Sequence, residues 1–352
     1  MLSTMTRPPR SKLRQIGVNV ALLIGVSLIC AVILETAVRI TLPVYSPAGR
    51  IHFECIDGMY LAPKNVQLRQ WTNTGDFDVT VWTNQQGFRD VKDLRDANAN
   101  DLLVIGDSFS FGHGVQAEDR YSNRLESALG QRVYNVSIPT NLDGYLRMAR
   151  YADEVSQGVG KVILGICMEN DISNYGAAPR ACTPRKDLTK LSSWIENPST
   201  VTLMDVKLLL TTYSAAYSAI TSIVHQNSTL KAIGLRLGLL NETVFAGAYG
   251  YDESKIVVSA NRLAQIAYEF DIIALIIPSR ALWQGDNQET ESRIHNSFVA
   301  EIAKHEIQTL DLRPVFERSG HPLEYHFRHD AHWNSEGHRV AAEELLTLIN
   351  AR

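Results

Sequence analysis

The chain has 352 residues, of which 45% are hydrophobic and 20% are charged, and these values are ordinary for a globular protein. The formal net charge is −4 at pH 7, and because the first fourteen residues hold four basic side chains and no acidic one, the remainder carries −8. An acidic chain without a basic patch argues against nucleic acid as a partner, since phosphate binding requires clustered lysines and arginines.

An uncharged run, residues 16–34, follows the basic tail. It is about long enough to cross a bilayer as a helix, and the positive-inside rule places residues 1–15 in the cytoplasm. We therefore predict a single-pass anchor over residues 16–40 in the inner (cytoplasmic) membrane, with the rest of the chain in the periplasm. A cleaved signal peptide is the main alternative, and a buried core helix is a third one.

Residues 41–100 are expected to form a β-rich lead-in, in which residues 77–83 alternate as a strand does. From residue 101 onward, strand and helix patterns follow one another, which predicts an α/β fold with a parallel sheet covered by helices on both faces. The strands are predicted at 102–106, 132–137, 161–167, 271–278 and 307–312, and the helices at 118–129, 142–156, 253–269, 290–304 and 336–349.

Residues 176–250 interrupt this alternation. Within them, residues 208–224 carry no charge, but their many serines, threonines and alanines make the run only weakly apolar. We expect one helix of an inserted cap here, and a second membrane span is the alternative. The insertion is also a candidate lid for a pocket beside Ser108.

The four cysteines, Cys30, Cys55, Cys167 and Cys182, match no zinc or redox motif. Cys30 lies in the apolar run and Cys167 in a predicted strand, so free buried thiols are expected. A disulfide between Cys55 and Cys182 is the alternative outside the cytoplasm.

The first chemical signal is the segment Gly106–Val115, GDSFSFGHGV, which lies between a predicted strand and a helix. A serine at such a turn projects its hydroxyl at the carboxyl edge of the sheet, where ligands bind in open α/β folds. The helix N-terminus also offers unpaired N–H groups that can stabilise an oxyanion. Ser108 is therefore a candidate nucleophile; alternatively, Asp107 and Ser108 only cap the helix.

The second signal is His329–His338, HDAHWNSEGH, between the last predicted strand and the last helix. An aspartate beside a histidine can hold the imidazole by one ring nitrogen while the other accepts a proton from a serine. Asp330 and His332 are thus candidates for the orienting acid and the base. A surface histidine cluster is one alternative, and a metal site built from His329, Asp330, His332 and His338 is another, although it lacks a familiar ligand spacing.

The third signal is Met168–Ser173, MENDIS, directly after a predicted strand. The amide of Asn170 can donate to an oxyanion there, although Asn-Asp is also a common turn pair. All three segments follow predicted parallel strands, whose carboxyl-end loops converge on one crevice. We therefore expect Ser108, Asn170, Asp330 and His332 to meet.

Together, GDSFSFG, the Asn-Asp pair and the D-x-H-W-N block of residues 330–334 resemble the SGNH hydrolase superfamily, also called GDSL-like esterases, in its membrane-anchored bacterial variant. The segment TNQQGFRD, residues 83–90, resembles one that those proteins carry before the first block. The likeness covers roughly residues 80–175 and 260–350, and the region between them matches no motif.

The resemblance implies a flavodoxin-like, three-layer doubly wound sheet and a serine hydrolase without cofactor or metal. It assigns Ser108 as the nucleophile, His332 as the base and Asp330 as its partner, with the backbone of Ser108 and the amide of Asn170 holding the oxyanion. In that family a glycine of a second block adds a backbone N–H to the oxyanion hole.

The chain departs from the family pattern at two places. The stretch that corresponds to the second block has Ser137 and Thr140 instead of glycine, and we expect the Thr140 N–H to be the second donor. Glu169 stands where the family usually has glycine. A carboxylate at that position would oppose an oxyanion if it pointed inward, and we expect it to point away.

The predicted organisation is a basic tail (1–15), an anchor (16–40), a lead-in (41–100) and an SGNH-like catalytic domain (101–352) with a helical insertion at about 176–250. The predicted function is ester hydrolysis or O-acyl transfer outside the cytoplasm, on an acylated small molecule or an O-acetylated envelope glycan, through an acyl-enzyme on Ser108. A non-catalytic, membrane-tethered scaffold or glycan-binding protein is the alternative, and a metal-dependent hydrolase is a third one. The sequence indicates no protein partner.

Overall fold

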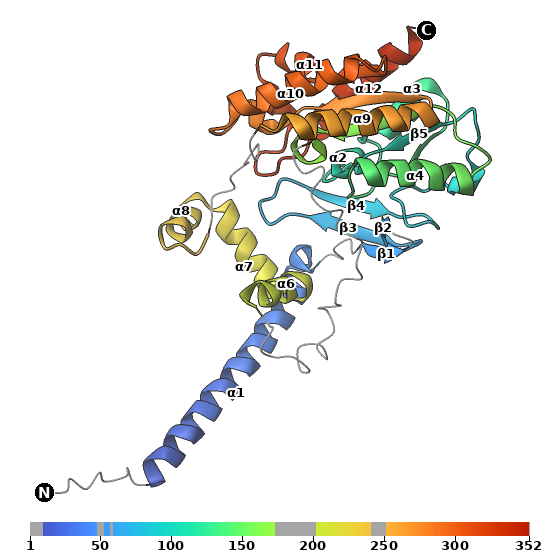
Figure 1. Cartoon of the computed structure of the whole chain (residues 1–352). Coiled ribbons are helices and arrows are strands. Elements are labelled where there is room, and N and C mark those ends of the chain that lie inside the picture. The colour runs from blue at the N-terminus through green and yellow to red at the C-terminus, as the bar shows by residue number, and fades with distance from the viewer. Residues whose placement is uncertain (1–9, 48–52, 57–58, 173–201, 241–250, 352) are drawn as a thin grey trace, which may run out of the picture.

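The computed structural model describes residues 10–47, 53–56, 59–172, 202–240 and 251–351 (Figure 1). Its centre is a sheet of five parallel strands in the order β6-β5-β7-β8-β9. The strands are β5(Leu102–Ile105), β6(Val133–Asn135), β7(Val162–Cys167), β8(Ile272–Ile277) and β9(Gln308–Asp311). Counted from β5 this is the 2-1-3-4-5 order of flavodoxin-like folds, which bind ligands where the order reverses, between the first and third strands. The predicted fold class is confirmed, and the reversal lies between β5 and β7.

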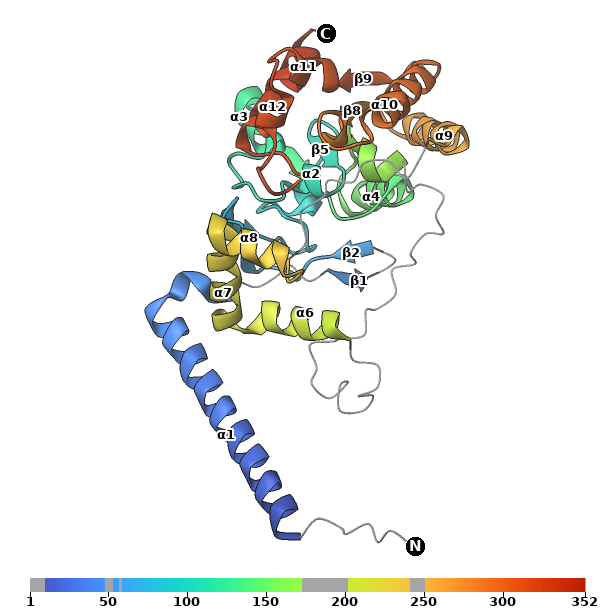
Figure 2. The ribbon, with the colours of Figure 1, turned by 90° about the vertical axis from the view of Figure 1, so that its left-hand side faces the viewer.

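Helices cover both faces of the sheet, as the views in Figures 1 and 2 show. Alternate residues along each strand point to opposite faces, so Leu103 and Leu164 enter one apolar cluster and Val104 and Ile163 the other. The first cluster is closed by α4(Leu142–Val155), α9(Glu253–Glu269) and α10(Gln288–Ala303), and the second by α3(Tyr121–Leu129), α11(Arg313–Glu317) and α12(Ser335–Asn350). The core strands are buried on both faces, which explains why they read as continuous apolar runs.

Two antiparallel hairpins precede the sheet. They are β1(Glu54–Ile56) with β2(Met59–Leu61), and β3(Gln67–Trp71) with β4(Asp78–Trp82). Val79 and Val81 of β4 pack against Phe111, which follows the candidate nucleophile closely in sequence. The lead-in is therefore not a separate spacer, because it contacts the loop that carries Ser108.

The helix α1(Arg10–Thr41) contains a segment, 14–41, long and apolar enough to cross a membrane, and this is the single candidate span in the described parts of the chain. The short helix η1(Pro43–Tyr45) follows it. Residues 1–9 of the predicted cytoplasmic tail lie outside the described residues.

The single helix predicted at 208–224 is wrong, because the chain forms α6(Leu203–Tyr213), α7(Ala215–Gln226) and α8(Ser228–Arg236). Ser214 ends α6 and caps α7, since its Oγ accepts a hydrogen bond from the N–H of Tyr217. Each helix is shorter than the roughly 20 residues that a membrane span requires, so the apolar run does not form a second span. The remainder of the predicted insertion, at residues 176–201 and 241–250, lies outside the described residues.

Of the cysteines, Cys30 and Cys167 are free thiols, and the predicted burial is confirmed for Cys167 but wrong for Cys30. Cys167 is buried at the end of β7, whereas Cys30 is exposed on α1. Cys182, one half of the alternative disulfide, lies outside the described residues.

Candidate active site

Ser108 begins a short helix, α2(Ser108–Phe111), just beyond the end of β5. Asp107 caps this helix, because its carboxylate accepts a hydrogen bond from the N–H of Phe109 at 2.9 Å. Gly112 ends it in the left-handed conformation, with φ of 83°, which costs glycine no side-chain clash. The strand, the cap and the glycine therefore fix the serine at the edge of the sheet. Asp107 does cap the helix, and Ser108 has a further contact.

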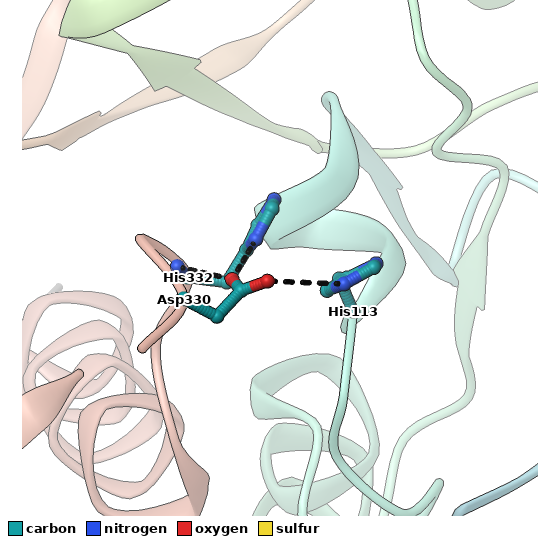
Figure 3. Close-up of side chains that lie close together, drawn as sticks. All are labelled: His113, Asp330 and His332. Atoms are coloured by element: carbon teal, nitrogen blue, oxygen red, sulfur yellow. Dashed lines mark hydrogen bonds and ion pairs between the residues drawn. The ribbon is translucent and has the colours of Figure 1, made fainter. Parts of the chain in front are cut away.

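That contact is with His332, 224 positions further along the chain: Ser108 Oγ lies 2.7 Å from His332 Nε2. The other ring nitrogen of His332, Nδ1, lies 2.5 Å from Asp330 Oδ1, which also accepts the backbone N–H of His332 at 2.9 Å (Figure 3). The loop thus folds the aspartate back onto its own histidine. The result is a Ser–His–Asp arrangement with both ring nitrogens of the histidine engaged.

The loop that carries Asp330 and His332 is held from β8. Arg280 begins η5(Arg280–Leu282) after that strand, and its guanidinium donates to the carbonyl oxygens of Asp330, at 2.7 Å, and of Phe327. Trp333, which is fully buried, packs edge-on against Phe109. Arg280 thus holds the loop before His332, and the packing of Trp333 holds it directly after His332.

His113 belongs to this site, although sequence reasoning did not single it out. Its Nε2 lies 3.7 Å from Asp330 Oδ2, and its ring centroid lies 4.3 Å from that of His332. Figure 3 shows the Asp330 carboxylate with one oxygen toward each imidazole. The signal was present in the motif GDSFSFGHGV, but a histidine five residues after the serine has no meaning until the loop geometry is known.

Gln70 of β3 sets the tautomer of His113. The Oε1 atom of Gln70 accepts the backbone N–H of Gly114 at 3.1 Å, so its Nε2 is the atom that lies 2.8 Å from His113 Nδ1. An amide nitrogen only donates, and His113 Nδ1 must therefore be the acceptor. In the neutral ring the proton is then on Nε2, the atom that faces Asp330.

The electrostatics of these groups follow from burial and from each other. Burial by itself would raise the pKa of Asp330, but the nearby His113 and the hydrogen bonds from His332 outweigh it and hold this pKa below its ordinary value. Burial lowers the pKa of His113, and the neighbouring Asp330 opposes this effect only in part. Asp330 is thus an anion that has one carboxylate oxygen toward a neutral His113 and the other toward His332.

Asn170 lies across the β5–β7 reversal, in a π-helical turn, η3(Met168–Ile172), that follows β7. Its Nδ2 donates to Asp107 Oδ2 at 3.0 Å. Burial raises the pKa of Asp107, and the hydrogen bond from Asn170 opposes this rise. The structure thus ties Asn170 to the residue next to Ser108. The amide nitrogen carries two protons, so one remains for another acceptor.

Thr140 lies half-buried in the loop between β6 and α4. Its side chain packs over Gly144 so closely that a Cβ on that glycine would overlap with it. Ser137, the other residue at a family glycine position, is fully buried and donates its backbone N–H to Asn135 Oδ1 at 3.0 Å. The backbone N–H of Ser137 is therefore already hydrogen-bonded. The backbone N–H of Thr140 makes no hydrogen bond with any part of the chain that the structure describes.

Glu169 is half-buried in the same turn as Asn170. Burial raises its pKa, as do the charges of Glu291 and Asp107, while His332 lowers it. His332 and Asp107 flank Ser108, so Glu169 lies within electrostatic range of the site. This carboxyl belongs to the surroundings of the site rather than to a remote surface.

The alternative metal site of four C-terminal residues is not assembled. His338 is buried and its Nδ1 accepts the N–H of Tyr121, whereas His329 pairs with Asp76 at 3.0 Å. Within the described residues, the ligand atoms that do come within 4.8 Å of one another belong to His113, Asp330 and His332. The Asp330 carboxylate lies between 2.5 and 3.7 Å from the ring nitrogens of His332 and His113. The contact with Gln70 places a proton on His113 Nε2, which is the nitrogen that a metal would need.

The fold and the site define a flavodoxin-like α/β protein with a Ser–His–Asp arrangement at the carboxyl edge of its sheet. Residues 260–352 match the family model described as "SGNH hydrolase-like domain, acetyltransferase AlgX". Over these residues the match confirms the resemblance to the SGNH hydrolase superfamily that the sequence motifs indicate.

The chain is also similar to solved structures. One is a member of the lipolytic G-D-S-L family from Veillonella parvula, at 11% identity and a TM-score of 0.40, over 72% of this chain and 99% of the other. Another is a lipase/acylhydrolase from Enterococcus faecalis, at 11% identity and a TM-score of 0.39, over 72% of this chain and 96% of the other. No curated protein matches the chain significantly in sequence.

Proposed function

We propose that the chain is a serine-dependent esterase or O-acyltransferase that forms an acyl-enzyme on Ser108. One observation carries the proposal: the 2.7 Å contact between Ser108 Oγ and His332 Nε2, with Asp330 on the far side of the imidazole. A nucleophile within hydrogen-bond reach of a base that a third group orients is the geometry that acyl transfer needs.

In the proposed mechanism, Ser108 Oγ attacks the ester carbonyl while His332 Nε2 takes the hydroxyl proton. The tetrahedral intermediate expels the alcohol, which takes that proton from His332, and an acyl ester remains on Ser108. Water or an acceptor hydroxyl then attacks this ester, again with His332 as the base, and restores the free serine. Asp330 stabilises the imidazolium that forms in each half of the reaction.

The oxyanion is held, in this proposal, by three donors. The backbone N–H of Ser108 stands at the start of α2, the second amide proton of Asn170 is left over from its bond to Asp107, and the N–H of Thr140 is unengaged within the described residues. Preorganised donors of this kind each contribute about 3 kcal/mol to transition-state stabilisation. Asp107 acts here as a positioning residue, because it contacts Asn170 and not the reacting atoms.

We propose His113 as a second positioning residue. Its Nε2–H faces Asp330, and Gln70 of the lead-in hairpin directs the proton there. A continuous series of contacts therefore runs from Gln70 in the lead-in through His113, Asp330 and His332 to the nucleophile Ser108.

For the substrate we propose O-acetylated glycans of the cell envelope, reached from the periplasmic face of the inner membrane. The apolar helix α1 supports the membrane location, and the acetyltransferase named in the matching family model supports the acyl group. The second candidate is a non-catalytic scaffold or glycan-binding protein, which Glu169 and Thr140 favour because both depart from the family pattern.

Reaction of the purified full-length protein with a fluorophosphonate probe tests the proposal. We expect labelling of the wild type that is lost in Ser108→Ala, together with hydrolysis of short-chain aryl esters that the same variant loses. Ser110→Ala is the matched control, since Ser110 is buried two residues further along the same short helix. A wild-type protein that neither labels nor hydrolyses would support the scaffold, and loss of activity with a chelator would indicate a metal-dependent hydrolase.

A further inference from the structure

The outer end of α1 is built into the fold rather than merely attached to it. Val38 is 9% exposed and packs against Ala215, Ala216 and Ala219 of α7. In the apolar segment of α1 that precedes this contact, none of the described residues is buried. The helix α1 is therefore exposed and apolar along most of its length, and it packs against the rest of the protein at its C-terminal end.

Polar contacts complete this joint. The carboxylate of Glu35 accepts hydrogen bonds from Ser214 Oγ at 2.8 Å, from the N–H of Ala215 at 2.8 Å and from the N–H of Ala216 at 3.0 Å. The two N–H groups belong to the unpaired backbone donors at the N-terminus of α7, where a negative charge is favourable. Removal of residues 16–40 would take this cap away, so the joint argues for an anchor that stays on the mature chain.

The same joint fixes the end of α6. Arg39 donates to the carbonyl oxygen of Tyr213, the last residue of α6, at 2.5 Å, and pairs with Glu35 at 2.7 Å. Because Arg39 is close to the end of the candidate span, the C-terminus of α6 lies at the level where α1 would leave the hydrocarbon. Figure 2 shows α6 running across the end of α1 rather than along it.

Helix α6 has the composition of a lipid-facing helix. Its eleven residues read LMDVKLLLTTY, with Asp205 and Lys207 as the only charged side chains. Val206, Leu210 and Tyr213, at spacings of four and three residues, are 37%, 37% and 50% exposed. A helix this apolar is normally buried or in contact with lipid, and a tyrosine at its edge is typical of a membrane interface.

We propose that α6 lies flat in the membrane interface, on the side of the α/β domain, and that α1, α6 and α7 form one membrane-seated unit. The partner of this surface is the lipid bilayer. With eleven residues α6 is about 16 Å long, too short to cross the hydrocarbon and suited to the interfacial plane. The proposal rests on α1 crossing the membrane and is independent of the reaction at Ser108.

Spin-label accessibility in the full-length chain, reconstituted in lipid nanodiscs, tests the proposal. Single cysteines are placed in a background without the native cysteines: Leu210→Cys on α6, Ile24→Cys within α1 and Val258→Cys on α9. Val258 is the matched control because it is an exposed apolar side chain, at 50%, on the α/β domain. Collisions of each label with oxygen, which enters lipid, are compared with collisions with a water-soluble nickel chelate.

We expect the labels at 24 and 210 to favour oxygen, with 24 deeper, and the label at 258 to favour the nickel chelate. A label at 210 that behaves like the one at 258, while 24 remains embedded, would overturn the proposal for α6 alone. A water-exposed label at 24, or its loss from a processed chain, would overturn the anchor itself. Shielding of 210 only when two copies share a nanodisc would assign the surface to self-association and also overturn the proposal.

Discussion

Nε2 of His113 lies 3.7 Å from Oδ2 of Asp330, while the other oxygen of that carboxylate, Oδ1, contacts His332 (Figure 3). A neutral N–H at this position favours the anionic aspartate without competing for the proton of His332. The relationship joins the loop after the nucleophile to the loop that carries the base, so both loops share one carboxylate.

The first prediction concerns His113. His113→Phe should lower kcat about fivefold and leave KM nearly unchanged, since it removes the N–H that faces the Asp330 carboxylate at 3.7 Å, a contact worth about 1 kcal/mol. His113→Gln, which keeps an N–H donor, should recover most of the loss. Steady-state kinetics on an aryl ester measure both values. Equal losses in the two variants would mean that His113 only fills space.

The second prediction concerns Asp330. Asp330→Asn should reduce kcat by about 10³- to 10⁴-fold, because the amide presents the wrong hydrogen-bonding partner to His332 Nδ1. The rate of fluorophosphonate labelling measures the effect on the nucleophile directly. Asp76→Asn, at the neighbouring His329, is a control that should retain labelling. Unchanged labelling in Asp330→Asn would contradict the proposed role.

The third prediction concerns the packing beneath the nucleophile. A Cβ on Gly165 of β7 would overlap with Ser110 Oγ, which accepts a hydrogen bond from Tyr121 at 2.8 Å. Gly165→Ala should therefore lower the free energy of unfolding by about 1–3 kcal/mol. Adding Ser110→Ala removes the overlapping atom and should make the double variant more stable than Gly165→Ala. Denaturant unfolding of all four proteins measures the coupling, and simple additivity would show that the overlap is relieved elsewhere.

The fourth prediction concerns pH and His326, which is 4% exposed and packs edge-on against Phe316. Burial lowers its pKa to about 3, whereas an unfolded histidine titrates near 6.5. Between these values the unfolded chain binds a proton that the folded chain does not, so stability falls as the pH decreases. From pH 7.5 to 5 the loss is about 2 kcal/mol. His326→Phe should lack this part of the loss in denaturant unfolding at the two pH values; an identical pH dependence in both proteins would contradict it.

The fifth prediction concerns Glu169. Burial and the charge of Glu291 raise its pKa, so its negative charge develops only as the pH rises through that elevated value. Because Glu169 is next to Asn170, a proposed oxyanion donor, a negative charge on Glu169 would oppose the negative charge of the oxyanion. The ratio of kcat for Glu169→Gln to kcat for the wild type should therefore be near one in acid and increase severalfold toward alkaline pH. A ratio that stays constant from pH 5 to 9 would show that Glu169 does not act on the oxyanion.

The α/β core could be predicted from the sequence because its signals are local. A strand such as β8 is a continuous apolar run, and α12 is capped by Asn334, whose side chain accepts hydrogen bonds from the N–H groups of Glu336 and Gly337. The positions of Ser108 and His332 could also be predicted, because Ser108 directly follows the strand β5 and His332 lies just before the helix α12.

The remainder depends on contacts between distant segments, which no local pattern encodes. Gln70 and His113 are 43 positions apart, and only the packing of the β3–β4 hairpin brings them together. The break at Ser214 was missed because an uncharged helical run continues through it, and the cap that Glu35 adds comes from 179 positions away.

The 224 positions between Ser108 and His332 also bear on how the protein is made. The helix α1 and Ser108 are made before His332, which follows the serine by 224 positions. Folding that depends on such distant contacts is completed late. In the proposed mechanism, the nascent chain therefore lacks its base until residue 332 has been made, and a message truncated before that residue yields Ser108 alone.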